Sequence, residues 1–502
     1  MKTFQSLRIF FLLGVLVAFS TFVNGCEPKE ENQEQLLNAS VNPQFTEGAP
    51  YPAEDPPERD PKNDMDPIPV PDGPLVGDLS PLNDPVTIRA LDIPNDSTPK
   101  NKEMRAPLFY KKYSELPNLT SVTSGCCPEI SVAENGNTVI MTGNTWMALS
   151  KDAGTTFTYI NPTTLFPNDD GPLCCDQVVE YLPEFDMFVW LLQYRNNASG
   201  DNKLRMAAQT TQQINSSNGT SWTYWDFSSN IFDAASTLDY NDLTFGNGSL
   251  WWTTQNGTGR IVVRIPQSQI AAKGTINFSY TGGTDALWSH LTHNATNTVY
   301  WAGHINNSQL RVYSMRDGDG FYSWRTVNIN SWPNGTNSSV TPTQDWMLPF
   351  EDWKHYVFGN ALQGESVWFA WLASANDRFP QPHVQMTKIN TSSFTLDQQV
   401  QIWNPDFAFM DAFLSTNSRG ELGMDVAFGG GPYHPSNAVG VWGDFVVYYP
   451  RLSTRTTNRW GDYNTSRRSG SNGVEWVAGG YTMETDAMGN NIMLPHYIRF
   501  GR

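Results

Sequence analysis

Polar residues that can carry acid–base chemistry recur at the start of short apolar runs along most of the chain. The runs open at Cys175–Val179, Asp239–Leu243, Trp288–Leu291, Gln344–Met347, Phe409–Ala412 and Arg459–Tyr463. They follow one another at intervals of about 50 to 65 residues, which is typical of a repeated structural unit. If such units surround one axis, the openings converge on one face. Carboxylates beside imidazoles could there provide a general acid and a general base.

We predict the catalytic groups among these openings and the runs that follow them. They are Asp176, His290, His293, His304, Arg311, Tyr313, Asp345, His355 and Asp411. Substrate-binding groups are predicted at Gln177, Asp239, Asp242, Trp346 and Asp462. The opposing interpretation is structural, because an aspartate at such a position often only hydrogen-bonds the backbone of the next unit. His290 and His293 are three residues apart, so on a strand at most one of them would face the axis.

Three kinds of carbohydrate site fit these residue types. A glycoside hydrolase places two carboxylates, or a tyrosine and a carboxylate, at the scissile bond. A lyase that acts on uronate polymers needs a base, an acid and a cation that neutralises the sugar carboxylate. The residues that supply those types within one predicted unit are His290, His293, His304, Arg311 and Tyr313. A binding module needs only tryptophan faces and carboxylates that hydrogen-bond hydroxyls or hold a structural calcium ion.

Composition and missing motifs exclude other classes of function. The formal net charge is −18 and no basic cluster offsets it, so the chain should repel nucleic acid. The sequence lacks H-E-x-x-H, G-x-S-x-G and a P-loop, which excludes zinc proteolysis, α/β-hydrolase chemistry and nucleotide hydrolysis. No cofactor is predicted apart from the structural calcium ion. We expect a monomer that cleaves an extracellular polysaccharide by lyase or hydrolase chemistry, with glycan binding alone as the alternative.

The elements that must position these groups are strands. Residues 105–502 consist of short aromatic and β-branched runs between Gly and Asn turns, and only Gln267–Ala272 looks helical. This pattern predicts an all-β body, which at about 400 residues is too long for one sandwich. The six openings, with a further unit at Ile130–Tyr159, predict a single seven-bladed β-propeller. The run Ile492–Phe500 would close its ring by pairing with N-terminal strands.

One motif carries a resemblance to a known family. Ser150–Phe157 (SKDAGTTF) matches the Asp-box S-x-D-x-G-x-x-[FW] and resembles the sialidase-like BNR propellers. In that hairpin the Asp caps backbone amides, the Gly takes a positive φ and the aromatic packs between strands. Sialidases carry an early Arg-Ile-Pro motif, whereas Arg264–Pro266 falls mid-chain here. The resemblance therefore implies the propeller fold. Some ulvan lyases resemble this architecture as well.

The first residues predict export and lipid anchoring. Lys2 and Arg8 precede the apolar run Ile9–Val23, so residues 1–25 are predicted as a signal peptide. Val-Asn-Gly-Cys ending at Cys26 resembles a bacterial lipobox, which implies lipidation of Cys26. The acidic run Glu27–Glu31 resembles the surface-export signal of Bacteroidetes lipoproteins, which implies an outer-membrane lipoprotein that faces outward. The alternative is a secreted glycoprotein, because the chain carries about fifteen N-x-S/T sequons.

The remaining cysteines form two adjacent pairs, Cys126–Cys127 and Cys174–Cys175. In an exported chain they predict one or two disulfides that staple the two segments together. Bare adjacent pairs without C-x-x-C spacing chelate one metal ion poorly, so no thiolate metal site is predicted. Residues 26–104 are acidic and Pro-rich, which predicts a disordered tether that holds the body away from the membrane.

Overall fold

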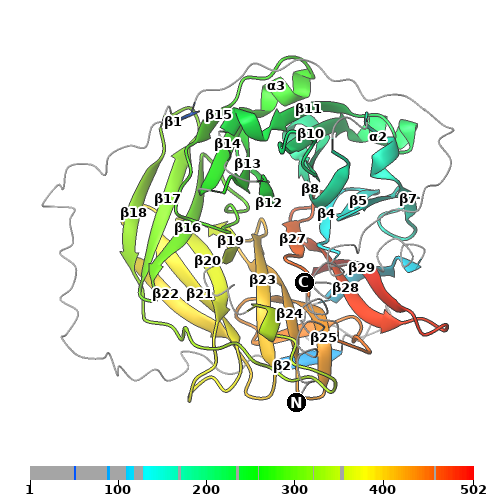
Figure 1. Ribbon diagram of the computed structural model, residues 1–502. Helices are drawn as coiled ribbons and strands as arrows, with labels where there is room; N and C mark the ends of the chain where they lie inside the picture. Colours follow the sequence, from blue (N-terminus) through cyan, green and yellow to red (C-terminus); the bar gives the residue numbers. More distant parts are fainter. Residues whose placement is uncertain are drawn as a thin grey trace, which may run out of the picture.

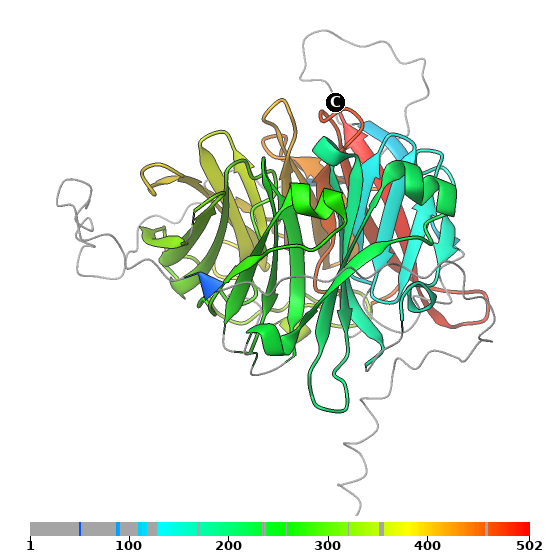
Figure 2. The same ribbon diagram turned by 90° about the horizontal axis from the view of Figure 1, so that it is seen from above.

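The structure is a computed structural model that describes residues 50–51, 87–90, 109–117, 128–167, 171–232, 234, 237–257, 259–319, 321–350, 356–456 and 460–502. Among these residues the elements are nearly all strands, with two short α-helices, α2 (Thr211–Ser217) and α3 (Gln267–Ala272). The strands surround a common axis as antiparallel sheets, and the protein is a β-propeller (Figures 1 and 2). The predicted fold class is confirmed, and α3 coincides with the helical segment that the sequence indicated.

Successive strands form the sheets in chain order. The first sheets contain β4 (Ser131–Asn135), β5 (Thr138–Gly143), β6 (Trp146–Ser150) and β7 (Thr158–Ile160); β8 (Leu173–Leu182), β9 (Met187–Tyr194), β10 (Lys203–Thr210) and β11 (Thr223–Ser228); and β12 (Asp239–Phe245), β13 (Ser249–Gln255), β14 (Arg260–Pro266) and β15 (Ser279–Thr281). The next contain β16 (Thr298–Asn306), β17 (Gln309–Arg316) and β18 (Ser323–Asn328); and β19 (Val357–Gln363), β20 (Ser366–Ala373), β21 (His383–Asn390) and β22 (Leu396–Ile402).

The last sheet contains nine described strands and closes the ring. It contains β23 (Ala408–Thr416), β24 (Leu422–Gly430), β25 (Tyr433–Val441), β26 (Val446–Tyr449), β27 (Thr465–Arg468), β28 (Trp476–Thr485) and β29 (Asn491–Gly501), together with β2 (Thr87–Ala90) and β3 (Phe109–Glu115). Only the pair Ser436↔Thr482 joins β25 to β28. The C-terminal β29 pairs antiparallel with the N-terminal β3, as the sequence predicted. Because the nine strands are hydrogen-bonded into one sheet, the count of seven blades stays a prediction.

Two segments of the predicted tether are strands in the structure. β1 (Pro50–Tyr51) pairs parallel with β15, and β2 pairs parallel with β26. The rest of residues 26–104, together with the signal peptide and Cys26, lies outside the described residues. The tether and the anchor therefore stay predictions.

Tryptophan fills the space between and within the sheets. Twelve tryptophans are among the largest fully buried side chains, including Trp190, Trp252 and Trp346. Trp346 is 1% exposed and packs at 6.5 Å from Trp460, measured between ring centroids. Its ring lies in the hydrophobic core, and its substrate-binding role stays a prediction.

Several inner strands are irregular where they open. The ladder shifts register between Cys175 and Gln177 on β8, between Asp239 and Asp242 on β12, and between Met410 and Phe413 on β23. Residues in or near such openings have a left-handed backbone: Glu129 (φ 43°), Tyr240 (56°), Trp288 (58°) and Asp411 (53°). Bulges and positive φ values at non-glycine residues redirect side chains and concentrate at functional sites. The strand openings therefore have the kind of irregular backbone that functional sites often have.

The turn between β6 and β7 is organised by Asp152. Its Oδ1 accepts from the amides of Thr155 (3.0 Å) and Thr156 (2.8 Å), and Gly154 has a φ of 79°. Phe157 packs at 5.9 Å from Tyr497 of β29. The hydrogen bonds that Asp152 accepts, those from Thr156 first, lower its pKa to about 2. This carboxylate builds a hairpin at the periphery and does no chemistry at the axis.

Candidate functional site

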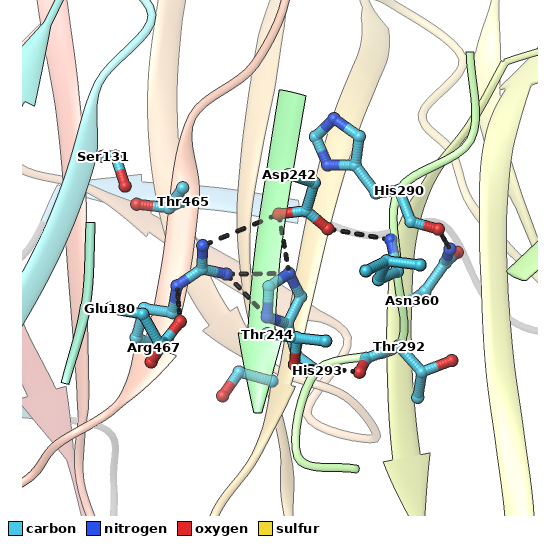
Figure 3. A network of polar contacts seen from close by, with 12 residues as sticks. Ser131, Glu180, Asp242, Thr244, His290, Thr292, His293, Asn360, Thr465 and Arg467 are labelled. Carbon is cyan, nitrogen blue, oxygen red and sulfur yellow. Dashed lines mark hydrogen bonds and ion pairs between the residues drawn. The ribbon is translucent and has the colours of Figure 1, made fainter. Parts of the chain in front are cut away.

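Four charged or ionisable side chains from separate parts of the ring meet at the centre (Figure 3). They are Glu180 of β8, Asp242 of β12, His293 from the segment before β16, and Arg467 of β27. Arg467 Nε lies 2.7 Å from Glu180 Oε2, an ion pair by distance without the alignment of a hydrogen bond. Arg467 Nη1 lies 2.7 Å from the ring nitrogens of His293, and Asp242 Oδ1 lies 3.6 Å from His293 Nε2. This set, the central cluster, ties the inner strands together.

Burial sets the protonation of the central cluster. It raises the pKa of Glu180 to about 7, against the opposing effect of Arg467. It lowers the pKa of His293 to about 3 and that of His290 to about 4, so both imidazoles are neutral at neutral pH. Burial opposes ionisation of Asp242, but the imidazoles, Arg467 and the amide of Leu291 bring its pKa below the usual value. Because the imidazoles are neutral, we assign the stabilisation of this anion to Arg467 and the amide.

A second group of carboxyls lies around Asp176. Burial, followed by the charges of Asp239 and Asp462, raises the pKa of Asp176 to about 7, while a hydrogen bond with Glu129 acts in the opposite direction. Asp176 is 5% exposed, whereas Asp239 and Asp462 are half-buried. Asp239 Oδ1 accepts from Gln193 Nε2 at 2.9 Å. A carboxyl group with a raised pKa therefore lies next to carboxyl groups that reach solvent, and a general acid differs from its partner carboxylate in the same way.

Polar atoms without a hydrogen-bond partner among the described residues gather beside these carboxyls. They are Tyr240 Oη, Tyr463 Oη, His290 Nε2, Arg260 Nε and Nη2, and both carboxyl oxygens of Asp411. All five residues are at most 2% exposed. The ring of Tyr240 lies 5.0 Å from that of His290 and 6.1 Å from that of Tyr463, and Arg260 Cζ lies 5.4 Å from it. We call these five residues the unpaired cluster.

Such a cluster needs an explanation, because buried polar groups are nearly always hydrogen-bonded. Each unsatisfied group costs about 1–3 kcal/mol. Arg260 keeps one hydrogen bond, from Nη1 to the Tyr240 carbonyl (2.6 Å), and burial lowers its pKa to about 10. The cluster offers both donors and acceptors, so water or a hydroxyl-rich ligand would satisfy it.

Aromatic faces border the unpaired cluster. The rings of Trp288 and Tyr356 are stacked at 5.0 Å and 20°, and Trp288 lies 5.4 Å from Tyr240. Both residues are half-buried. A half-exposed, stacked indole beside unsatisfied polar atoms is a suitable surface for a sugar ring.

Asp411 is fully buried, and burial followed by the charges of Asp462 and Asp425 raises its pKa well above the usual value. Folded protein therefore keeps a proton on Asp411 that the unfolded chain releases above about pH 3.9. That stabilisation is complete below the unfolded pKa and is lost as pH rises toward the raised pKa of the folded protein. Asp411→Asn removes the titration. We expect its free energy of unfolding, relative to wild type, to increase from pH 5 to pH 8 in urea unfolding; a pH-independent difference would contradict the assignment.

Seven predicted site residues lie in these groups. They are Asp176, Asp239, Asp242, His290, His293, Asp411 and Asp462. The expectation that His290 and His293 point to opposite faces of a strand is wrong. Residues 288–295 form no regular strand, and Asp242 acts on both imidazoles. The segment lies against β19, where the amides of His290 and His293 donate to the carbonyls of Val357 and Asn360.

Gln177 and Asp345 are placed elsewhere by local structure. Gln177 Oε1 accepts from Trp190 Nε1 (3.0 Å), so its side chain points into its own sheet. Asp345 accepts from the amides of Ser339 (2.9 Å) and Met347 (3.0 Å) in a loop before β19, and the strand itself begins at Val357. Gln344–Met347 is therefore no strand opening, and the site role predicted for each residue is corrected.

The lyase set predicted within one unit is not assembled as expected. Arg311 and the Tyr313 hydroxyl both donate to Asp285, and Tyr313 stacks on Trp301 at 5.2 Å. His304 lies between Trp332 and Trp371, at 5.0 and 4.8 Å. His304 thus packs against β20 of the next sheet, while Arg311 and Tyr313 are held by Asp285, so these three side chains do not form one acid–base set. His355 lies outside the described residues.

Sequence reasoning missed Glu129, Glu180, Tyr240, Arg260, Tyr463 and Arg467. Tyr240 and Tyr463 directly follow Asp239 and Asp462, so their position at an opening could have identified them. Glu129 follows a cysteine pair by two residues, much as Asp176 follows Cys174–Cys175. Arg260 lies on β14, the third strand of its sheet and not a strand opening, so the sequence carried no such signal for it.

The cysteine pairing differs from the prediction. Cys174 forms a disulfide with Cys175, its neighbour in sequence, and so does not staple distant segments. Cys126 and Cys127 lie outside the described residues. Within the described part of the chain, no group of three or more His, Cys, Asp or Glu side chains is arranged to hold a metal ion. No helix in that part is long and apolar enough to cross a membrane.

Comparison with known proteins gives no family. No family model matches the chain, and no curated protein is similar to it. Among solved structures, the Dos1 propeller aligns over 78% of this chain and 95% of its own, at 10% identity and a TM-score of 0.37. An α-L-arabinofuranosidase from Fusarium graminearum aligns over 74% and 92%, at 11% identity and 0.36. A xylan β-1,4-xylosidase from Bacillus halodurans aligns over 76% and 99%, at 9% identity and 0.28. Similarity at this level carries no argument about function.

Proposed function

We propose that this protein is a carbohydrate-active enzyme that hydrolyses glycosidic bonds of an extracellular polysaccharide. The observation that carries the proposal is the unpaired cluster: five buried residues present unsatisfied donors and acceptors beside stacked aromatic rings. A sugar ring supplies hydroxyls, which both donate and accept, together with an apolar face that fits an indole.

Asp176 is the proposed general acid. It must hold a proton near neutral pH, and its pKa of about 7 provides that. Asp462 is the proposed ionised partner, because its charge acts on Asp176, Tyr240, Tyr463 and Asp411 and it reaches solvent. Asp239, held by Gln193, keeps Asp176 protonated through its charge. Two carboxyl groups in opposite protonation states are what glycoside hydrolysis requires.

A uronate lyase is the second candidate, and one observation favours it. The ring of neutral His290 lies 5.0 Å from that of Tyr240 and 5.7 Å from that of Tyr463, and Arg260 Cζ lies 5.4 Å from the Tyr240 ring. A base, an acid and a cation thus come together, with His290 as predicted but with Tyr240, Tyr463 and Arg260 in place of Tyr313 and Arg311. Against it, the charges of Asp239 and Asp462 act at the same place and would repel a uronate carboxylate. Hydrolysis is therefore the first choice.

Incubation of the purified protein with a panel of algal and plant polysaccharides separates these functions. Hydrolysis gives new reducing ends without absorbance near about 235 nm, whereas β-elimination gives an unsaturated uronate that absorbs there. We expect the first result. Retardation in a polysaccharide gel without cleavage would show glycan binding alone, and neither cleavage nor retardation would refute a carbohydrate function.

We further propose that the protein acts at the cell surface, held on the outer membrane by a lipid on Cys26. The support is the apolar leader, the lipobox-like sequence at Cys26 and the acidic run behind it. Labelling of expressing bacteria with a radioactive fatty acid should mark the wild-type chain and not Cys26→Ser; equal labelling of both would exclude the anchor.

A further inference from the structure

The Cys174–Cys175 disulfide lies where Asp176 enters the site. Over this stretch Leu173, Cys175 and Gln177 of β8 pair with Tyr194, Gln193 and Leu192 of β9. Five consecutive residues therefore oppose three, and the two without a ladder partner are Cys174 and Asp176. Such bulges bend a strand and re-aim its side chains. The disulfide joins two adjacent residues into a small covalent ring inside this double bulge.

A second contact links the disulfide to the charge that acts on Asp176. Gln193, opposite Cys175 in the ladder, places Nε2 3.4 Å from Cys175 Sγ and 2.9 Å from Asp239 Oδ1. Its Oε1 accepts from Asn241 Nδ2 at 2.8 Å. Asp239 is the first of the charges that raise the pKa of Asp176. The disulfide thus contacts the side-chain amide of Gln193, which hydrogen-bonds Asp239. Its second cysteine, Cys175, directly precedes Asp176 in the chain.

We propose that the Cys174–Cys175 disulfide is a positioning element for the acid Asp176. The covalent ring restricts the backbone at the double bulge, so that Asp176 stays buried among Asp239, Asp462 and Glu129 instead of turning to solvent. Both cysteines are half-buried, so the disulfide borders the half-exposed part of the site. The expected effect of the disulfide on catalysis rests on the proposed function. Its expected effect on the position of Asp176 does not.

The test measures the proton on Asp176 through stability, which needs no substrate. The free energy of unfolding is measured from pH 5 to pH 8 for four chains: wild type, Asp176→Asn, Cys174→Ser/Cys175→Ser, and the triple variant. With the disulfide intact, Asp176→Asn should gain stability relative to its parent as pH rises toward about 7, because the folded protein holds a proton that the unfolded chain has lost. Without the disulfide, we expect this pH-dependent difference to shrink or vanish. An unchanged difference would overturn the proposal.

Controls separate a local effect from a general one. Cys126→Ser/Cys127→Ser removes the other cysteine pair and should leave the pH-dependent difference intact. If the double serine variant at 174 and 175 does not fold, Gln193→Met keeps the disulfide but removes its link to Asp239. The pH-dependent stability difference between Asp176→Asn and its parent should then shrink as well. An unchanged difference in the Gln193→Met background would refute the link between the disulfide and Asp239.

Activity gives the second readout. On a substrate found with the polysaccharide panel, loss of the disulfide should lower kcat by about 10- to 100-fold, as expected for a displaced catalytic group, with a smaller effect on KM. The alkaline limb of the pH profile should also move below its wild-type position. If no substrate is found, the proposed function fails while the stability measurement still decides the positioning role.

Discussion

Asp176→Asn is expected to lower kcat by about 10²- to 10⁴-fold, the range by which a positioned general acid accelerates a reaction. KM should change little, because Asn keeps the size of the side chain and loses only the transferable proton. Asp176 must be protonated to act, and its pKa is about 7. Wild-type activity should therefore fall as pH rises through about 7, and the residual activity of the variant should lack that alkaline limb. Steady-state kinetics from pH 4 to pH 9 measure both.

Asp345→Asn is the matched control for this change. Sequence analysis also predicted Asp345 as catalytic, but its carboxylate accepts amides in a loop before β19. We expect its kcat to equal that of wild type. An Asp176→Asn variant as active as the Asp345→Asn variant would remove Asp176 from the mechanism.

Arg467→Met is expected to destabilise the protein by about 3–5 kcal/mol, the loss typical when one partner of a buried ion pair is removed. The Arg467 side chain is only 4% exposed, and it lies between Glu180 and Asp242. Methionine fills much of the volume but leaves the two acidic groups facing each other. Urea unfolding measures the loss.

The loss should depend on pH. Glu180, with a pKa raised to about 7, is protonated at pH 5.5 and largely ionised at pH 8, so Arg467→Met should cost more at pH 8. Glu180→Gln in the same chain should recover part of the stability at pH 8. Arg311→Met is the control, since the Arg311–Asp285 pair is much more exposed than the central cluster, at 29% and 53% for the two side chains, and should contribute about 1 kcal/mol or less. Equal losses in Arg467→Met and Arg311→Met would show that the central cluster does not stabilise the ring.

Periodicity in the sequence predicted the fold and part of the site. The spaced openings identified Asp176, Asp239, Asp411 and Asp462, because inner strands of a propeller begin near one end of its axis. Ring closure by residues 492–500 followed from the same repeat, and β29 pairs with β3. Both inferences rest on features that recur along the chain.

The predictions that failed depend on single side chains in irregular segments. Gln344–Met347 looks like an opening, but Asp345 organises a turn and the strand starts at Val357. Bulges on β8 and β12 insert residues into the ladder, so alternation of faces cannot be read from residue spacing. Arg467 of β27 and Asp242 of β12 are far apart in sequence, and only the folded ring brings them together, whereas Arg260 of β14 reaches the Tyr240 carbonyl within its own sheet.

A crystal structure with a bound oligosaccharide would show whether the unpaired cluster holds the substrate. We expect a sugar ring with hydroxyls within hydrogen-bond distance of Tyr240 Oη, Tyr463 Oη and the Asp411 carboxyl, with its scissile oxygen next to Asp176. Water alone at the unpaired cluster, with the sugar bound elsewhere on the ring, would contradict it.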